Sequence, residues 1–135
     1  MYTRTGPVLA CITPQESCRH IIEAAAQLAA NLGTDLQVVT IQPKKQDAKR
    51  RAQDMKTLCA LASRTGFEIS VRYSDHPANS VAAAARECGA VHIFTGMPAG
   101  STDFVGKLSV LLEHVPISLV SSDVYCTVNL AAQLS

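Results

Sequence analysis

Apolar and polar residues alternate along the chain in a regular order, short apolar runs being followed by segments with helical spacing. The first run, Pro7 to Ile12, is continuous and apolar, which is typical of a strand buried on both faces. Beyond it, apolar residues recur three and four apart until Gly33, a residue suited to end a helix. We expect Thr13 to be the N-cap of this helix, with Pro14 at its first position and Glu16 completing a capping box.

The same order of strand and helix continues to residue 122. The remaining expected strands cover residues 36–41, 67–73, 90–96 and 115–120, and the remaining expected helices cover residues 44–65, 75–88 and 105–113. The run 67–73 alternates apolar and polar residues with a period of two, as a half-exposed edge strand does. Because short connections join the elements, we expect one α/β domain over residues 1–122, a parallel sheet doubly wound with helices on both faces. The pattern does not predict the structure of the tail, residues 123–135.

A sheet of this kind binds its ligands beyond the carboxyl ends of its strands, where the strand order reverses. Three segments that follow expected strands make up this candidate surface: 13–17, 41–44 and 96–102. In the third segment, backbone N–H groups and hydroxyls can hold an anion near a helix N-terminus; the residues concerned are Gly96, Gly100, Ser101 and Thr102. Lys107 faces either this loop or the solvent, and an ordinary glycine-bearing turn is the alternative interpretation of the loop.

The composition narrows the classes of function. The 135 residues carry a formal net charge of +1, and 17% of them are charged. This is not the composition of a disordered chain, and the charge gives no field that attracts nucleic acid or an anionic membrane. No apolar run is long enough to span a membrane, and the first six residues do not form a signal peptide. We therefore expect a cytoplasmic protein with no nucleic-acid partner and no membrane insertion.

Positive charge is concentrated in one segment. Six of the twelve Lys and Arg residues lie between Lys44 and Lys56. The segment is either a docking face for an acidic partner or phosphate groups, or a solvated helix face with Asp47 and Asp54 interleaved. The second interpretation is favoured.

No grouping of residues predicts catalysis or metal binding. The four histidines fall in four different elements, and no nucleophile elbow, dinucleotide loop or Walker loop fits the sequence. We expect His92, inside a strand, to be a hydrogen-bonded structural residue. The five cysteines lack C-x-x-C spacing and are interpreted as free thiols, with Cys11, Cys59 and Cys88 on apolar stripes. Cys18, near the start of a helix, is the thiol that a helix dipole would activate if it were exposed.

Five segments in a fixed order carry a family resemblance: Val8–Pro14, Ile21–Gly33, Asp35–Val39, His92–Gly96 and Glu113–Val120. Together they resemble the universal stress protein family, in particular the version inside the sensor kinase of the bacterial Kdp potassium system. The resemblance implies the strand order 3-2-1-4-5 and a bacterial protein without enzymatic activity that acts in stress response or signalling. It also implies a homodimer formed through the edge of the last strand, here the fifth, and in one subclass the binding of ATP or AMP.

The resemblance, together with the surface described above, gives the candidate ligand-binding residues: Thr13, Ile41, Gly96, Gly100, Ser101, Thr102 and Lys107. The sequence departs from the nucleotide-binding subclass in three places. Thr13 stands where that subclass has Asp, and Ala99 stands at the second glycine of its G-x-x-G motif. The loop before the last helix is shorter than the pattern, so the further Gly-Ser or Gly-Thr of that subclass has no clean counterpart. Two alternatives to a ligand-binding domain therefore stay open. One is a structural or regulatory dimer that has lost nucleotide binding, and the other is an ATP-using enzyme of related fold, for which only Asp103 offers a carboxylate near the loop.

Overall fold

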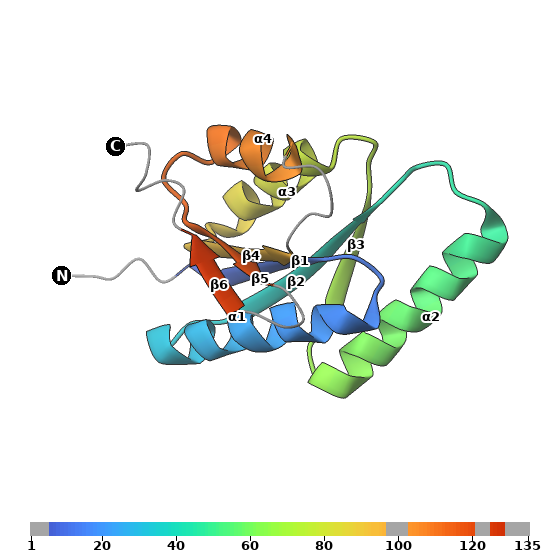
Figure 1. Ribbon diagram of the computed structural model, residues 1–135, viewed down its shortest axis with the longest axis horizontal. Coiled ribbons are helices and arrows are strands. Elements are labelled where there is room, and N and C mark those ends of the chain that lie inside the picture. The colour runs from blue at the N-terminus through green and yellow to red at the C-terminus, as the bar shows by residue number, and fades with distance from the viewer. Residues whose placement is uncertain (1–5, 97–102, 121–124, 129–135) are drawn as a thin grey trace.

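The sheet is the centre of the fold. The computed structural model describes residues 6–96, 103–120 and 125–128. Within them, one six-stranded sheet has the order β3-β2-β1-β4-β5-β6 (Figure 1). Its strands are β1 (Val8–Ile12), β2 (Leu36–Gln42), β3 (Ile69–Tyr73), β4 (His92–Gly96), β5 (Ile117–Val120) and β6 (Tyr125–Val128). The first five pair in parallel, so the predicted parallel sheet and its order 3-2-1-4-5 are confirmed.

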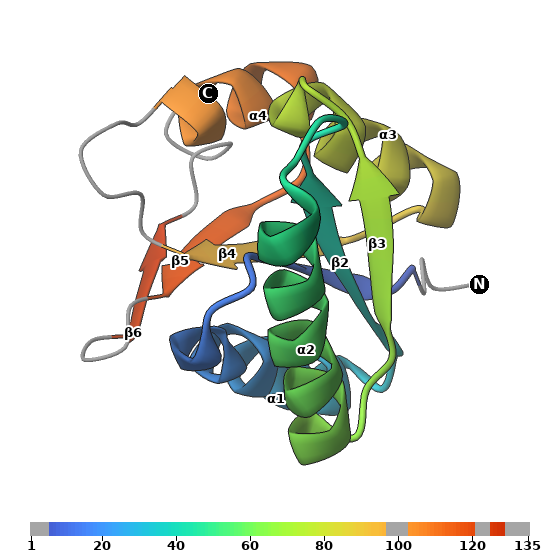
Figure 2. The same ribbon diagram turned by 90° about the vertical axis from the view of Figure 1, so that its right-hand side faces the viewer.

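Helices cover both faces of this sheet. They are the 3₁₀ helix η1 (Glu16–Cys18) and the α-helices α1 (Arg19–Leu32), α2 (Ala48–Thr65), α3 (Pro77–Cys88) and α4 (Asp103–Leu111). Figure 2 shows α1 and α2 on one side of the strands and α3 and α4 on the other. Gly33, Gly66 and Gly89 end α1, α2 and α3 in the left-handed conformation that glycine adopts most readily. None of the helices in the described ranges has the length and apolar character of a membrane span.

The sixth strand is the element that the sequence pattern missed. β6 pairs antiparallel with β5, from Ile117 opposite Val128 to Val120 opposite Tyr125. The expectation that the fifth strand forms an exposed edge is therefore wrong for this chain. An uncovered β5 would present a row of unpaired N–H and C=O groups, and the returning chain pairs with them. The four-residue β6 is too short for its pattern to stand out in the sequence.

The start of the first helix also differs from the prediction. Thr13 is not an N-cap, because α1 begins only at Arg19 with Cys18 as its cap residue. The Thr13 carbonyl oxygen accepts a hydrogen bond from the Gln15 N–H at 2.8 Å. The chain then makes the 3₁₀ turn η1 before α1 begins, and Gln15 is the cap residue of that turn. Glu16 completes no capping box; its carboxylate instead binds Arg64 of α2.

Two apolar clusters fill the space between the sheet and its helices. All five residues of β1 are buried, as the continuous apolar run predicts. Val8, Ala10 and Ile12 face α1 and α2, while Leu9 and Cys11 face α3 and α4. Buried alanines on α1 and α3 leave little space between helix and sheet, which explains why so apolar a core needs few aromatic rings.

β3 is a half-covered edge strand, as its alternating pattern predicts. Ile69 and Val71 pack against the cluster beneath α1 and α2, whereas Ser70 on the opposite face is exposed. Because α2 covers one face only, the other face of β3 meets solvent beside the end of α3.

Candidate functional site

The residues that follow β1 and β4 lie at one edge of the sheet, where the strand order reverses. Ile12 is opposite Thr40 of β2, and Cys11 is opposite Thr95 of β4. This register places Thr13, Ile41 and Gly96 at the same end of three adjacent strands. We call this end of the sheet the carboxyl edge. It is where open α/β sheets bind their ligands.

Of the other four predicted site residues, the structure describes only Lys107. Gly100, Ser101 and Thr102 lie outside the described residues. Lys107 is exposed on α4. Its role as an anion-binding residue therefore stays a prediction.

Side chains at the carboxyl edge are already hydrogen-bonded to their neighbours. The Thr13 hydroxyl lies 3.5 Å from the sulfur of Cys18. Gln42, which is buried, donates from its amide Nε2 to the Thr40 hydroxyl oxygen at 2.9 Å. Because a buried amide without a partner is costly, this bond holds the end of β2 in place. This pair was not among the predicted site residues, although Thr40 and Gln42 lie two residues apart on one face of the strand.

Backbone contacts fix the loops beside this edge. The Ser74 N–H donates to the carbonyl oxygen of Gln42 at 2.8 Å, and the Ser74 hydroxyl accepts from the His76 N–H at 3.0 Å. The Asp75 carboxylate accepts a hydrogen bond from the Lys44 N–H at 3.3 Å. The connections that follow β2 and β3 are thus tied to each other.

Gly96 lies close to α1. A Cβ added at this position would be 3.3 Å from the Cδ1 atom of Ile21 and 3.9 Å from the carbonyl oxygen of Val120. The absence of a side chain therefore lets α1 pass close to the end of β4. It also leaves the backbone at the carboxyl edge without a screening side chain.

The cysteines near this edge are poor nucleophiles. Burial raises the pKa of the Cys11 thiol to about 12, so this residue stays protonated at neutral pH. Cys18 is buried, which argues against an activated thiol there. Of the three cysteines predicted on apolar stripes, Cys11 is buried and Cys88 is half-buried. Cys59 is exposed, because it lies on the solvent side of α2, and the prediction was wrong for it.

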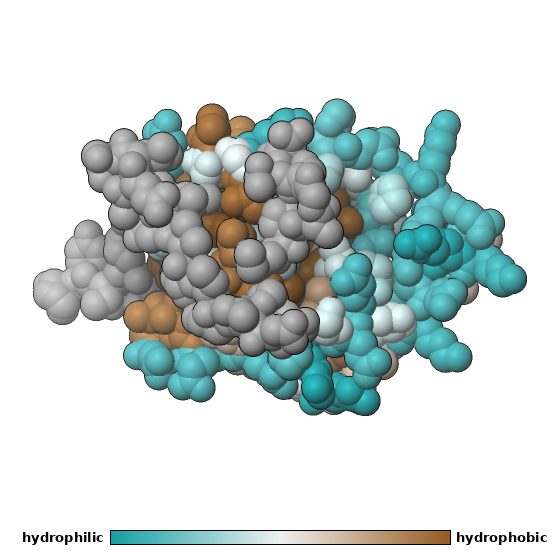
Figure 3. All heavy atoms as spheres, in the orientation of Figure 1, coloured by the Kyte–Doolittle hydropathy of each residue, from teal (hydrophilic) through white to brown (hydrophobic). Residues whose placement is uncertain are grey.

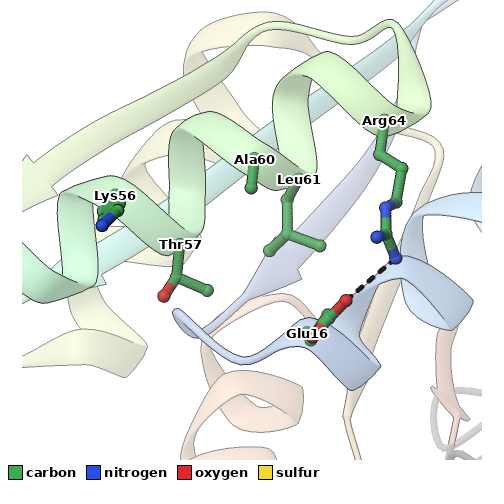
Figure 4. A pocket seen from close by; sticks show the side chains of 6 residues that line it. All are labelled: Glu16, Lys56, Thr57, Ala60, Leu61 and Arg64. Carbon is green, nitrogen blue, oxygen red and sulfur yellow. Dashed lines mark hydrogen bonds and ion pairs between the residues drawn. The ribbon is translucent and has the colours of Figure 1, made fainter.

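A hollow of about 220 Å³ opens between η1 and α2, close to the loop that follows β1 (Figure 4). Lys56 and Thr57 lie at one end of it, and Leu61 forms part of its apolar wall. The guanidinium of Arg64 donates to the carboxylate of Glu16 at 2.9 Å across the other end. Both side chains are more than half exposed, so this ion pair adds little stability, but it joins α2 to the loop after β1.

The basic segment projects from the molecule at the start of α2. Figure 3 shows hydrophilic residues gathered at the end of the molecule where this half of the helix lies. The two interleaved carboxylates have structural partners: Asp47 accepts a hydrogen bond from the Arg50 N–H at 3.3 Å, and Asp54 lies 3.7 Å from Arg50. The guanidinium of Arg51 stacks over Tyr73, 5.1 Å from the ring centroid. These local contacts agree with a solvated helix face.

His92 has the hydrogen-bonded role that the sequence predicts. Its Nε2 atom lies 2.7 Å from the hydroxyl oxygen of Ser118, which is fully buried. The ring stacks on Phe94 with centroids 4.9 Å apart. Burial lowers the pKa of the imidazole, so the neutral form is favoured at neutral pH.

The described residues hold no cluster of potential metal ligands. No three His, Cys, Asp or Glu side chains within residues 6–96 and 103–120 gather closely enough to hold a metal ion.

Comparison with solved structures identifies the fold. A universal stress protein from Pseudomonas aeruginosa matches 96% of the chain with a TM-score of 0.68 and 17% identity, over 50% of its own length. A universal stress protein family member from Burkholderia pseudomallei matches 89% of the chain over 98% of its own length, with a TM-score of 0.62 and 18% identity. A universal stress protein solved in complex with cAMP matches 87% of the chain over 98% of its own length, with a TM-score of 0.60 and 14% identity.

The chain thus spans half of the Pseudomonas protein and nearly all of the other two. No protein-family model and no curated protein matches the sequence. The likeness therefore lies in the arrangement of strands and helices. On that arrangement, this chain has the fold of the universal stress proteins.

Proposed function

We propose that the chain is a cytoplasmic, non-enzymatic domain that binds a phosphate-bearing ligand, an adenine nucleotide in the first place, at the carboxyl edge. It would act in stress response or signalling as a homodimer. The observation that carries the proposal is the position of Thr13 and Gly96 at the ends of adjacent strands where the strand order reverses. The structural neighbour that holds cAMP supports a nucleotide as the ligand.

The local chemistry favours an anionic group over a neutral one. Gly96 exposes backbone at the end of β4, and α4 begins at Asp103, after the segment 97–102. The N-terminus of a helix carries partial positive charge and backbone N–H groups that point toward an anion. Lys107 in the second turn of α4 adds a positive charge near this end of the helix.

Thermal unfolding in the presence of ATP, AMP and cAMP tests the proposal. A ligand present at about one hundred times its dissociation constant adds about 2.7 kcal/mol to the free energy of unfolding, a rise of several degrees in Tm. No rise with any of the three nucleotides contradicts the proposal.

Substitutions on β2 locate the site. Ile41 is half-buried at the carboxyl edge, and Ile41→Glu places a negative charge there, whereas Ile41→Gln changes polarity without charge. We expect the charged variant to lose most of the nucleotide-induced rise and the neutral variant to keep more of it. Gln37→Glu is the matched control, since Gln37 lies on the same strand and face, four residues away at the opposite end. An equal loss in the control would place the ligand elsewhere.

A regulatory dimer without a ligand is the second candidate. It is favoured by the side chains at the carboxyl edge, because Thr13 and Gln42 already have partners within the chain. Because β6 covers β5, the outer edge of β6 is the sheet edge left on this side for self-association. Sedimentation velocity shows whether the chain is a dimer, and thermal unfolding shows whether a nucleotide binds. A dimer whose Tm no nucleotide changes supports the regulatory candidate.

A further inference from the structure

A second hollow, of about 270 Å³, lies between the end of α3 and strands β2 and β3. We call it the β3 hollow. It is lined by Gln37 near the start of β2, by Ser70 and Arg72 of β3, and by Glu87 and Cys88 at the end of α3. All these residues lie toward the amino ends of the strands or on the open face of β3, away from Thr13 and Gly96. The hollow comes near the carboxyl edge at Arg72, which is opposite Ile41 of β2. Its other lining residues lie away from that edge, so the ligand proposed here is a different one from the nucleotide proposed there.

The hollow follows from the alternation of residues in β3. Ile69 and Val71 point toward the helices α1 and α2, so Ser70 and Arg72 point to the other face. On that face α3 packs over β2 and against α4, and β3 extends beyond it. An edge strand with polar residues on an uncovered face leaves a groove beside the last helix that packs on the sheet.

The hollow combines polar side chains at its wall with a small apolar floor. Leu9, Val39 and Ala84 are buried and contribute the floor. Gln37 and Ser70 are exposed at its wall, and their side chains have no hydrogen-bond partner among the residues that the structure describes. Ligand sites characteristically combine an apolar surface with a few polar groups that converge on it.

The ion pair between Arg72 and Glu87 lies at the rim of the hollow, and both groups can form further hydrogen bonds. One Nη atom of Arg72 donates to a carboxylate oxygen of Glu87 at 2.7 Å, and the other lies 3.5 Å from the second oxygen. The pairing lowers the pKa of Glu87 and raises that of Arg72, so both groups are charged at neutral pH. A guanidinium has five N–H donors, and a carboxylate accepts more than two hydrogen bonds. Each partner therefore keeps the capacity to bind an opposite charge.

We propose that the β3 hollow binds a free α-amino acid with a short aliphatic side chain. Arg72 would take the carboxylate of the amino acid and Glu87 its ammonium group, while the side chain would lie on Leu9, Val39 and Ala84. A zwitterion matches a rim that presents one charge of each sign, whereas a nucleotide or another multiply charged anion meets the repulsion of Glu87. The volume of about 270 Å³ is enough for a small amino acid.

Titrations followed by amide NMR test the proposal with three probes that share the same branched aliphatic group. The probes are L-valine, 3-methylbutanoate, which lacks the ammonium group, and 2-methylpropan-1-amine, which lacks the carboxylate. We expect L-valine at millimolar concentration to shift the amide signals of Ser70, Arg72 and Cys88, and each analogue to bind about tenfold more weakly. No shift with L-valine, or equal binding of all three probes, overturns the proposal.

Two variants and a control assign the binding to the hollow. Glu87→Gln replaces the charged acceptor for the ammonium group by a neutral amide oxygen, so L-valine binding weakens about tenfold, while 3-methylbutanoate binding does not weaken. Ser70→Val adds an apolar branched side chain at an exposed strand position, which a strand accepts, and narrows the hollow. Glu68→Gln removes the same charge from an exposed residue just before β3 that does not line the hollow. If Glu68→Gln weakens L-valine binding as much as Glu87→Gln does, the effect is one of general charge and the proposal fails.

Discussion

The carboxyl edge and the β3 hollow both place polar groups beside apolar strands, but they differ in what those groups already bind. At the carboxyl edge, the Thr13 hydroxyl contacts Cys18 and the Gln42 amide donates to Thr40. In the β3 hollow, the side chains of Gln37 and Ser70 have no such partner among the described residues. The edge is the position at which open α/β sheets generally bind ligands, whereas the hollow holds side chains without such partners.

The difference shows that topology and local chemistry are separate guides to function. The end of a parallel sheet is a binding place because of strand order, whatever residues stand there. A groove beside an edge strand depends on which side chains alternate onto the uncovered face. Tests that change one end of the sheet and leave the other intact therefore separate the two guides.

The largest expected effect on the free energy of unfolding comes from one of two single variants, each of which adds a methyl group at one end of the sheet. In Gly6→Ala, the new Cβ would overlap with the carbonyl oxygen of Gly89, so the backbone must shift at one of the two positions. We expect a loss of about 3 kcal/mol in the free energy of unfolding. In Gly96→Ala, the new Cβ meets the flexible end of Ile21 at 3.3 Å, and we expect a loss below about 1 kcal/mol.

Urea unfolding of both variants measures this contrast between the ends of the sheet. Gly33→Ala is a useful third variant. The φ of Gly33 is +70°, a backbone conformation that is strained for alanine, although no atom lies within 4 Å of the added Cβ. If Gly6→Ala and Gly96→Ala cost the same, the amino end is less rigidly packed than the structure indicates.

A smaller effect is expected from pH, acting at His92 near the amino end of β4. Burial lowers the pKa of this histidine in the folded state below its ordinary value of 6.5. The unfolded chain therefore binds the proton more readily as the pH falls through this value, and the free energy of unfolding decreases toward acid. In His92→Gln, whose amide can still reach Ser118, this part of the decrease disappears.

Tm measured between neutral and mildly acid pH checks the role of His92. The exposed His114→Gln serves as the control for the loss of one histidine. A fall in Tm with acid that is as steep in His92→Gln as in the parent chain would assign the effect to other groups.

The smallest effect on stability is expected at the rim of the β3 hollow. Glu87 is exposed, and exposed ion pairs contribute little to folding. We expect Glu87→Gln to change Tm no more than the control Glu68→Gln does, although it weakens L-valine binding. A large loss of stability in Glu87→Gln alone would make the ion pair a structural feature of β3 and α3.

Local patterns in the sequence account for most of the elements. Continuous apolar runs predicted the buried strands, as in β1, and glycines 33, 66 and 89 predicted the ends of three helices. The alternation in β3 predicted an edge strand with one open face. These predictions succeeded because burial and backbone conformation determine the pattern of residue types within a short segment of the sequence.

Contacts between distant residues left no such record. The cap predicted at Thr13 was wrong: a 3₁₀ turn with Gln15 as its cap residue precedes α1, and Glu16 pairs with Arg64 of α2. β6 and the covered edge of β5 could not be predicted from a four-residue segment. The Arg72–Glu87 pair joins a strand to a helix fifteen residues later in the chain, and only their packing brings the two charges together.

The sequence by itself thus determined the order of strands and helices, the buried faces and the edge at which the strands end. The tertiary structure decided which polar groups are already engaged and which remain open, because hydrogen bonds and ion pairs depend on distances that no local pattern encodes. For that reason the carboxyl edge was foreseen as a candidate site, whereas the β3 hollow became visible only once β3 was placed beside α3.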